Sequence, residues 1–158
     1  MIFATVGTQL PFPRLIDAMD AIAAATEERI VAQVGPESGD WPHLEQYANL
    51  APKRFEELFQ EARLIVAHAG VGTILSAKRF GKPLVILPRR HALGEHRNDH
   101  QMATSHTVLQ TLKGVHIAWQ AEDLAALVAR QDLEPADMSE SPTHRDLVER
   151  LRAFIRAA

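Results

Sequence analysis

The stretch that decides the fold class is Leu64-Ile65-Val66-Ala67-His68-Ala69-Gly70-Val71-Gly72-Thr73. Its first residues are apolar without alternation, which is typical of a strand covered by helices on both faces. Two glycines and a threonine follow, and apolar residues then recur at helical spacing until Gly81, with Pro83 just beyond. The stretch therefore predicts a buried strand, a glycine-rich turn and a helix.

The same alternation of apolar runs and helical patterns continues on both sides of this stretch. Apolar runs predict further strands at residues 2–6, 30–34, 84–87 and 115–119, and the turn-rich stretch 37–52 leaves room for a short strand near Tyr47. Helical periodicity predicts helices at 12–25, 55–62, 99–106 and 121–129. Because strands and helices alternate and the strands are wholly apolar, we expect an α/β fold, a Rossmann-like doubly wound parallel sheet.

The 158 residues suffice for one such domain and are too few for two. We assign residues 1–130 to the sheet domain and the acidic, polar residues 131–143 to a linker. Residues 144–158 predict a C-terminal helix, because its apolar residues fall on one helical stripe: Leu147, Leu151, Phe154 and Ile155. Two interpretations of this helix remain open, since it can close the same sheet or contact a partner.

Composition excludes several classes of protein. Apolar residues make up 46% of the chain and charged residues 23%, as in a packed globular domain. A formal net charge of -3 argues against a broad basic face, so we expect no nucleic-acid partner. The chain has no Cys, which excludes disulfides, thiolate metal sites and Cys nucleophiles. The first residues lack a signal-peptide pattern and no run is apolar enough to span a bilayer, so we expect a soluble protein.

Gly70 and Gly72 lie between a predicted strand and a predicted helix, where main-chain N–H groups can approach an anion without a Cβ in the way. The helix dipole favours a phosphate there, and Thr73 can cap the helix or donate to a phosphate oxygen. A plain strand-to-helix turn explains a lone Gly-x-Gly equally well. The dinucleotide fingerprint is incomplete, because Leu75 stands in the place of its third glycine, and this disfavours a nicotinamide-dependent enzyme.

The polar loop 88–101 should lie beside the glycine loop, because parallel strands end at one edge of the sheet. Its carboxylate, amide and imidazole groups suit the hydroxyls of a sugar, while its guanidinium groups suit a carboxylate or a phosphate: Arg89, Arg90 and Arg97. His96 and His100 also raise a zinc site, but no His-Glu-x-x-His pattern accompanies them and we disfavour a metal. A solvated charged loop is the simpler alternative.

Three segments in this order resemble the C-terminal domain of family 28 glycosyltransferases: His68-Ala69-Gly70-Val71-Gly72-Thr73, Gly81-Lys82-Pro83-Leu84-Val85-Ile86-Leu87-Pro88 and Asn98-Asp99-His100-Gln101. The opening Val6-Gly7-Thr8-Gln9 resembles the small, single-domain branch of that family. This branch includes the catalytic subunit of the dolichol-linked N-acetylglucosaminyltransferase and the bacterial PssE-type polysaccharide subunits. Gly94-Glu95-His96-Arg97 is most similar to the PssE type. The resemblance covers about residues 1–105.

This resemblance implies one half of a GT-B enzyme, the half that binds a UDP-sugar donor. It implies an inverting transfer without a metal or cofactor, in exopolysaccharide or capsule biosynthesis, with glucuronate as the favoured sugar. The other half would be a membrane-anchored PssD-like subunit that binds a polyprenyl-diphosphate-linked sugar acceptor and supplies the catalytic base. The chain would then be cytoplasmic and recruited to the inner face of the cytoplasmic membrane by this partner.

By position, the resemblance implies which residues bind each part of the donor. The diphosphate would contact Gly7, Thr8, His68, Gly70, Gly72 and Thr73. The sugar would contact Glu95, Asn98, Asp99, His100 and Gln101, and a donor carboxylate or the partner would contact Arg89, Arg90 and Arg97. The ribose falls to Ser76, where the family often has an acidic residue. The alternative function is a non-catalytic subunit that enhances a partner glycosyltransferase.

Overall fold

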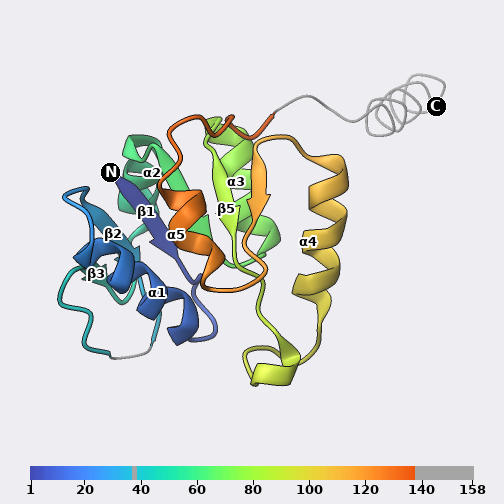
Figure 1. Cartoon of the computed structure of the whole chain (residues 1–158), viewed down its shortest axis with the longest axis horizontal. Helices are drawn as coiled ribbons and strands as arrows, with labels where there is room; N and C mark the ends of the chain where they lie inside the picture. The colour runs from blue at the N-terminus through green and yellow to red at the C-terminus, as the bar shows by residue number, and fades with distance from the viewer. Residues whose placement is uncertain (37–38, 138–158) are drawn as a thin grey trace, which may run out of the picture.

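A parallel six-stranded sheet organises the chain, and helices cover both of its faces (Figure 1). The computed structural model describes residues 1–36 and 39–137. The strands are β1 (Ile2–Thr5), β2 (Ile30–Gln33), β3 (Glu45–Tyr47), β4 (Leu64–Ala67), β5 (Leu84–Ile86) and β6 (Val115–Ile117). They lie in the order β3-β2-β1-β4-β5-β6, and every neighbouring pair is parallel. The predicted fold class is therefore confirmed.

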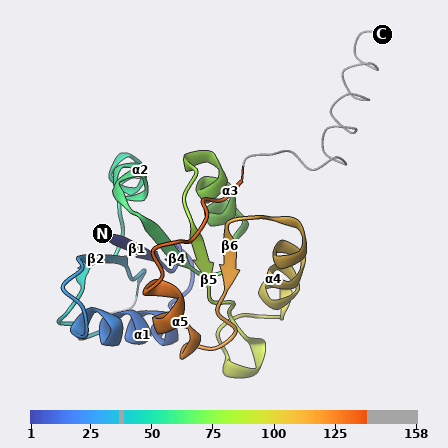
Figure 2. The same ribbon diagram turned by 45° about the horizontal axis from the view of Figure 1, so that its top comes forward.

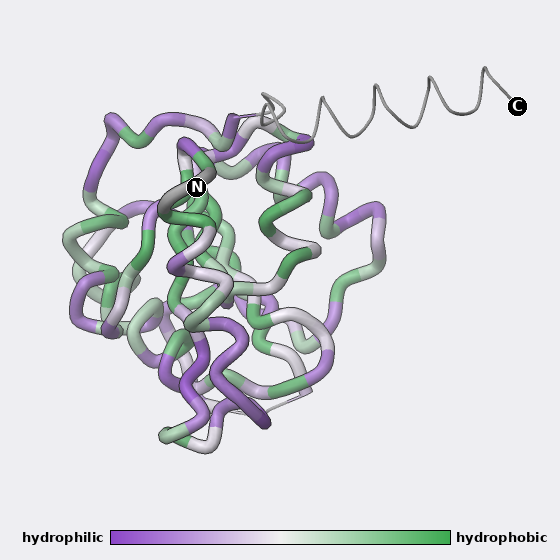
Figure 3. Tube along the Cα trace, turned by 90° about the vertical axis from the view of Figure 1, so that its right-hand side faces the viewer, coloured by the Kyte–Doolittle hydropathy of each residue, from purple (hydrophilic) through white to green (hydrophobic). Residues whose placement is uncertain are grey.

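The helices form one layer on each face of the sheet (Figure 2). One layer consists of α1 (Pro13–Ala24) and α5 (Asp123–Val128). These helices pack on strand side chains that include Ile2, Ala4 and Val66. The other layer consists of α2 (Pro52–Glu61), α3 (Val71–Phe80) and α4 (His100–Thr111), which pack around Phe3 and Ile65. Because both faces of the sheet are covered, the central strands β4 and β5 are wholly apolar, whereas the edge strand β3 is polar and only partly buried. Figure 3 shows this apolar interior beneath polar loops.

Local chemistry sets most helix boundaries. The helices α1 and α2 begin at Pro13 and Pro52, where the missing N–H has no intrahelical partner to lose. The helix α3 ends at Gly81, whose φ of 59° is the left-handed conformation that glycine adopts without strain. The helix α4 continues past residue 106 to Thr111, because Val108 is buried in the core and packing outweighs the weak helix propensity of this segment.

The start of the predicted linker packs against the sheet domain. Residues 131–137 contain no helix or strand, but Ala136 is buried and its N–H donates to Lys82 O at 3.1 Å. The rest of the predicted linker and the predicted C-terminal helix at 144–158 lie outside the described residues. None of the helices in the described part of the chain is long and apolar enough to cross a membrane.

The register of the strands brings several loops to one edge of the sheet. Thr5 pairs with Gln33 on one side and with Ala67 on the other, so β1, β2 and β4 end level. The chain leaves β1 towards one helical layer and leaves β4 towards the other, so the loops after these adjacent strands diverge. This strand order opens a crevice at the carboxyl edge, where ligands bind in open α/β sheets.

Candidate functional site

A cleft of about 640 Å³ lies at this carboxyl edge, between the loops that follow β1 and β4. Many of the residues predicted from the sequence line it: Gly7, Thr8, His68, Gly70, Gly72, Thr73, Ser76, Arg89 and Gln101. The remaining predicted residues, Arg90, Glu95, Arg97, Asn98, Asp99 and His100, do not line it. The structure therefore brings together all the residues predicted to bind the diphosphate and the ribose. It brings only Arg89 and Gln101 of the predicted polar-loop residues to the cleft.

The N-terminus of α3 presents unpaired main-chain N–H groups to the cleft. Thr73 and Ile74 donate to Gly70 O at 3.1 and 3.2 Å, whereas the preceding N–H groups of Val71 and Gly72 have no acceptor in the described structure. A Cβ at Gly72 would meet no atom within 4 Å, so the main chain here borders open space. Free N–H groups, the helix dipole and the Thr73 hydroxyl together make a site for an anionic oxygen.

Gly7 and Gly70 have a role that spacing alone does not reveal, because they make room for the imidazole of His68. A Cβ at Gly7 would lie 2.8 Å from His68 Cε1, and a Cβ at Gly70 would lie still closer to His68 Nε2. Gly7 also has a φ of 78°, which a residue with a side chain rarely adopts. The absence of a side chain at these two glycines therefore leaves the space that the imidazole ring occupies.

The imidazole of His68 is uncharged at neutral pH. Burial and the neighbouring Arg89 guanidinium lower its pKa to about 4, since both disfavour the protonated ring. His68 can therefore offer a neutral hydrogen-bonding group to a ligand, and the positive potential of the site comes from the helix N-terminus and from the nearby charge of Arg89.

Arg89 is buried and holds the loop between β1 and α1. Its side chain is 2% exposed, and its guanidinium donates to Val6 O at 3.1 Å, to Leu10 O at 2.7 Å and to Pro11 O. The guanidinium also lies 4.5 Å from the centre of the Phe12 ring. Burial lowers the pKa of Arg89 to about 10, which still leaves it charged at neutral pH. Its donors serve main-chain carbonyls, so Arg89 does not present a free guanidinium to a donor carboxylate.

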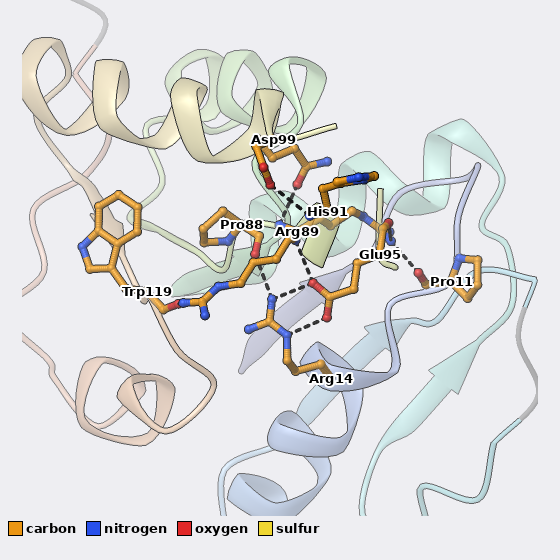
Figure 4. Close-up of polar contacts among 10 residues, drawn as sticks. Pro11, Arg14, Pro88, Arg89, His91, Glu95, Asp99 and Trp119 are labelled. Carbon is orange, nitrogen blue, oxygen red and sulfur yellow. Dashed lines mark hydrogen bonds and ion pairs between the residues drawn. The ribbon is translucent and has the colours of Figure 1, made fainter. Parts of the chain in front are cut away.

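Glu95 joins the polar loop after β5 to α1 (Figure 4). Its carboxylate accepts two hydrogen bonds from Arg14, at 2.6 and 2.8 Å, and one from Arg90 N at 2.9 Å. Arg90 donates to Trp119 O, away from the cleft. Of the three arginines in the polar loop, Arg97 is the exposed one. Glu95 and Arg90 thus connect parts of the protein, which is not the sugar contact that the resemblance implies for Glu95.

Gln101 is the predicted sugar residue that lines the cleft. Its Oε1 accepts from Ala69 N at 3.2 Å and from Arg89 N at 3.1 Å, so it joins the loops after β4 and β5. The Nε2 group is the part of this side chain that remains for a ligand. Asp99 instead accepts from His91 N at 3.0 Å, and His100 is exposed.

His96 lines the cleft although the sequence pattern does not place it in the sugar group. Its Nδ1 lies 3.2 Å from Asn98 O and 3.1 Å from Asn98 Oδ1. Asn98 Oδ1 also accepts from His100 N at 3.2 Å, which identifies that atom as the amide oxygen. Two oxygen acceptors at Nδ1 place the proton of the neutral ring on that atom, so Nε2 carries a lone pair that can accept a hydrogen bond from a hydroxyl.

Further lining residues include Val6 and Gln9, which flank Gly7 and Thr8, and residues from elements that carry no local motif. They are Thr5, Val6, Gln9, Leu10, Gln33, Leu50, Pro52, Phe55, Glu56, Arg79 and Phe80. The sequence contains a signal for two of them, because Thr5 and Gln33 are polar residues at the ends of otherwise apolar strands. In the structure the Thr5 hydroxyl donates to Gln33 Oε1 at 2.9 Å. The residues from α2 and the end of α3 join the site only through the tertiary fold.

Metal ligation finds no support in the described part of the chain, where no three side chains of His, Asp or Glu gather as a metal ion requires. His96 Nδ1 is directed to Asn98, and His100 lies outside the cleft.

Comparison with known proteins gives consistent matches. The family profile described as the glycosyltransferase family 28 C-terminal domain matches residues 1–150. The UDP-N-acetylglucosamine transferase subunit ALG13 of Eremothecium gossypii is 29% identical over 129 residues, covering 81% of this chain and 62% of the relative. The UDP-N-acetylglucosamine--N-acetylmuramyl-(pentapeptide) pyrophosphoryl-undecaprenol N-acetylglucosamine transferase of Rhizobium johnstonii is 29% identical over 138 residues, covering 80% of this chain and 35% of the relative. The chain thus spans only part of the length of each.

Solved structures agree with the fold. The crystal structure of MurG from Acinetobacter baumannii has a TM-score of 0.58 at 19% identity, covering 84% of this chain and 42% of that one. The NMR structure of ALG13 has a TM-score of 0.56 at 20% identity, covering 95% and 93%. At this level of identity the likeness concerns the fold alone.

We predict that Arg89→Lys lowers the free energy of unfolding by about 2 kcal/mol or more, because an ammonium cannot reach the carbonyls that the guanidinium joins. Urea unfolding measures this change. The matched control is Arg54→Lys on the exposed face of α2, which should change stability by less than about 0.5 kcal/mol. Equal stability of the two variants would show that Arg89 does not hold the loop.

We predict that His68 makes the protein less stable as the pH falls from about 6.5 to about 4. In this range the unfolded chain binds a proton at residue 68 and the folded protein does not, so stability is complete above the range and is lost within it. His68→Gln should flatten the pH dependence of unfolding over this range, by as much as about 3 kcal/mol. Parallel pH curves for the two proteins would contradict the assignment.

Proposed function

The chain belongs to the family of glycosyltransferase family 28 C-terminal domains, and from this premise we propose that it is the donor-binding subunit of a two-component inverting glycosyltransferase. The observation that carries the proposal is the meeting of the α3 N-terminus and the Gly7 loop in one cleft at the carboxyl edge of the sheet. Such a site suits the diphosphate of a UDP-sugar.

In the proposed reaction, an acceptor hydroxyl attacks the anomeric carbon of the donor sugar. The bond between this carbon and the β-phosphate oxygen breaks, and its electron pair leaves on UDP. The N–H groups of Val71 and Gly72 and the Thr73 hydroxyl would stabilise the negative charge that develops on the diphosphate. The proton of the acceptor hydroxyl would pass to a base on the acceptor-binding subunit.

The sugar would lie at the end of the cleft that Gln101, His96 and Thr8 line. Gln101 Nε2 can donate to a sugar oxygen, and His96 Nε2 can accept from a sugar hydroxyl. We propose these two groups as sugar contacts ahead of Glu95, Asn98 and Asp99, which make hydrogen bonds within the polar loop and to α1.

For the partner, we propose a membrane-anchored PssD-like subunit that binds a polyprenyl-diphosphate-linked sugar acceptor. The names of the relatives support this, since one is a transferase subunit and the other acts on a pyrophosphoryl-undecaprenol acceptor. The chain would then work at the inner face of the cytoplasmic membrane, in exopolysaccharide or capsule biosynthesis.

For the donor sugar, we propose glucuronate, with N-acetylglucosamine as the alternative that the relatives' names favour. Arg89 and Arg90 donate to main-chain carbonyls, so the argument for a sugar carboxylate now rests on Arg97. Arg97 is exposed and directly follows His96, which lines the cleft.

We predict that Thr73→Val weakens UDP binding about tenfold, because valine has the shape of threonine but cannot donate to a phosphate oxygen. Titration calorimetry with UDP measures the affinity. Thr107→Val on the exposed face of α4 is the control and should bind UDP as the wild type does. Failure of the wild-type chain to bind UDP, alone and with its partner present, would refute the proposed function.

We predict that the reconstituted pair uses UDP-glucuronate at least tenfold better than UDP-N-acetylglucosamine, and that Arg97→Gln removes this preference. Transfer assays that compare the two donors at equal concentration provide the measurement. A preference for UDP-N-acetylglucosamine would replace glucuronate with the sugar that the relatives' names contain and would leave the transferase proposal intact.

A further inference from the structure

Glu56 is the one carboxylate among the described residues that line the cleft. It comes from α2, which faces α3 across the cleft and carries no motif of the family. Half of its side chain is exposed, and its Oε1 lies 3.5 Å from Arg79 Nη1 on α3. The ion pair with Arg79 compensates part of this charge, but a half-exposed carboxylate still repels a diphosphate, so a different part of the ligand should lie next to Glu56.

The position of Glu56 in the cleft indicates which part of a bound nucleotide would lie next to its carboxylate. Its neighbour Arg79 lies seven residues after Gly72, or roughly 10 Å along α3 at the rise of an α-helix. Around this end the cleft is lined by apolar side chains that suit a flat base: Leu50, Pro52, Phe55 and Phe80. Glu56 thus lies on the nucleoside side of the cleft, away from the free N–H groups of the glycine loop.

Ser76, the residue that sequence position assigns to the ribose, is only partly available. Its hydroxyl donates to Gly72 O at 2.9 Å within α3, so its proton is used inside the helix. Serine oxygen is also a weaker acceptor than a carboxylate. A ribose at this place presents two neighbouring hydroxyl donors, and the two oxygens of one carboxylate can accept from both.

We propose that Glu56 accepts hydrogen bonds from the 2′- and 3′-hydroxyls of the ribose of the bound nucleotide, and that Arg79 positions its carboxylate. The inference rests on the proposed function, because it concerns the same nucleotide in the same cleft. It assigns to α2 the selection of ribonucleotides over deoxyribonucleotides, so the chain would take UDP in preference to 2′-deoxy-UDP.

The test is titration calorimetry of the full chain with UDP, 2′-deoxy-UDP and inorganic pyrophosphate. Wild-type protein should bind UDP about tenfold more tightly than 2′-deoxy-UDP. Glu56→Gln should weaken UDP binding about tenfold. It should weaken 2′-deoxy-UDP binding less, because this ligand keeps only the 3′-hydroxyl, and it should leave pyrophosphate binding unchanged. The matched control is Glu57→Gln on the same helix, where the carboxylate pairs with Arg54 outside the cleft, and it should bind all three ligands as the wild type does.

Each other outcome overturns the inference in a recognisable way. Unchanged UDP binding by Glu56→Gln removes Glu56 from the site and leaves the proposed function standing. An equal loss for UDP and 2′-deoxy-UDP shows that Glu56 acts through the base or through Arg79 and not through the ribose. If the wild-type chain binds none of the three ligands, the proposed function and the inference both fail. Because Glu56 is half exposed, Glu56→Gln should fold, and its thermal melting temperature confirms this.

Discussion

The cleft depends on one buried cation, the guanidinium of Arg89. This group comes from the loop after β5, yet its hydrogen bonds go to carbonyls of the loop after β1. The neighbouring main chain is fixed in turn by Gln101, which joins Arg89 N to Ala69 N in the loop after β4. Three loops from three strands are therefore fixed relative to one another before any ligand is present, and a ligand that binds there meets a preorganised site.

The electrostatics of the cleft vary along its length. At the glycine loop the attraction for an anion comes from main-chain N–H groups, a helix dipole and the nearby charge of Arg89, while burial keeps His68 neutral. At the other end, α2 and α3 contribute Glu56 and Arg79 beside apolar side chains. A ligand with a charged middle, a flat aromatic end and a hydroxyl-rich remainder matches the order of these environments along the cleft. This is the chemical character of a nucleotide-sugar.

The fold and the glycine loop could be predicted from the sequence because their signals are local. Apolar runs such as 64–67 and the change of hydrophobic period identify strands and helices without knowledge of the tertiary structure. The polar loop could be predicted only in part, since spacing shows which groups are near the site and not which way they point. Arg89 and Glu95 turn inward to hold main-chain atoms, whereas His96 turns to the cleft because Asn98 orients its ring. Glu56 could not be found from a pattern, because only the packing of α2 beside α3 brings it to the cleft.

Arg89 holds the loop between β1 and α1 through main-chain atoms, so the backbone conformation of this loop does not depend on its own side chains. Every oxygen that Arg89 holds there belongs to the main chain, at Val6, Leu10 and Pro11. The side chains of Thr8, Gln9 and Leu10 are exposed and make no hydrogen bond in the described structure, yet they border the cleft. Mutations can accumulate at these three positions without altering the course of the backbone. Members of a lineage that keep the arginine can thus diversify what they recognise by exchanging a few surface groups on an unchanged frame.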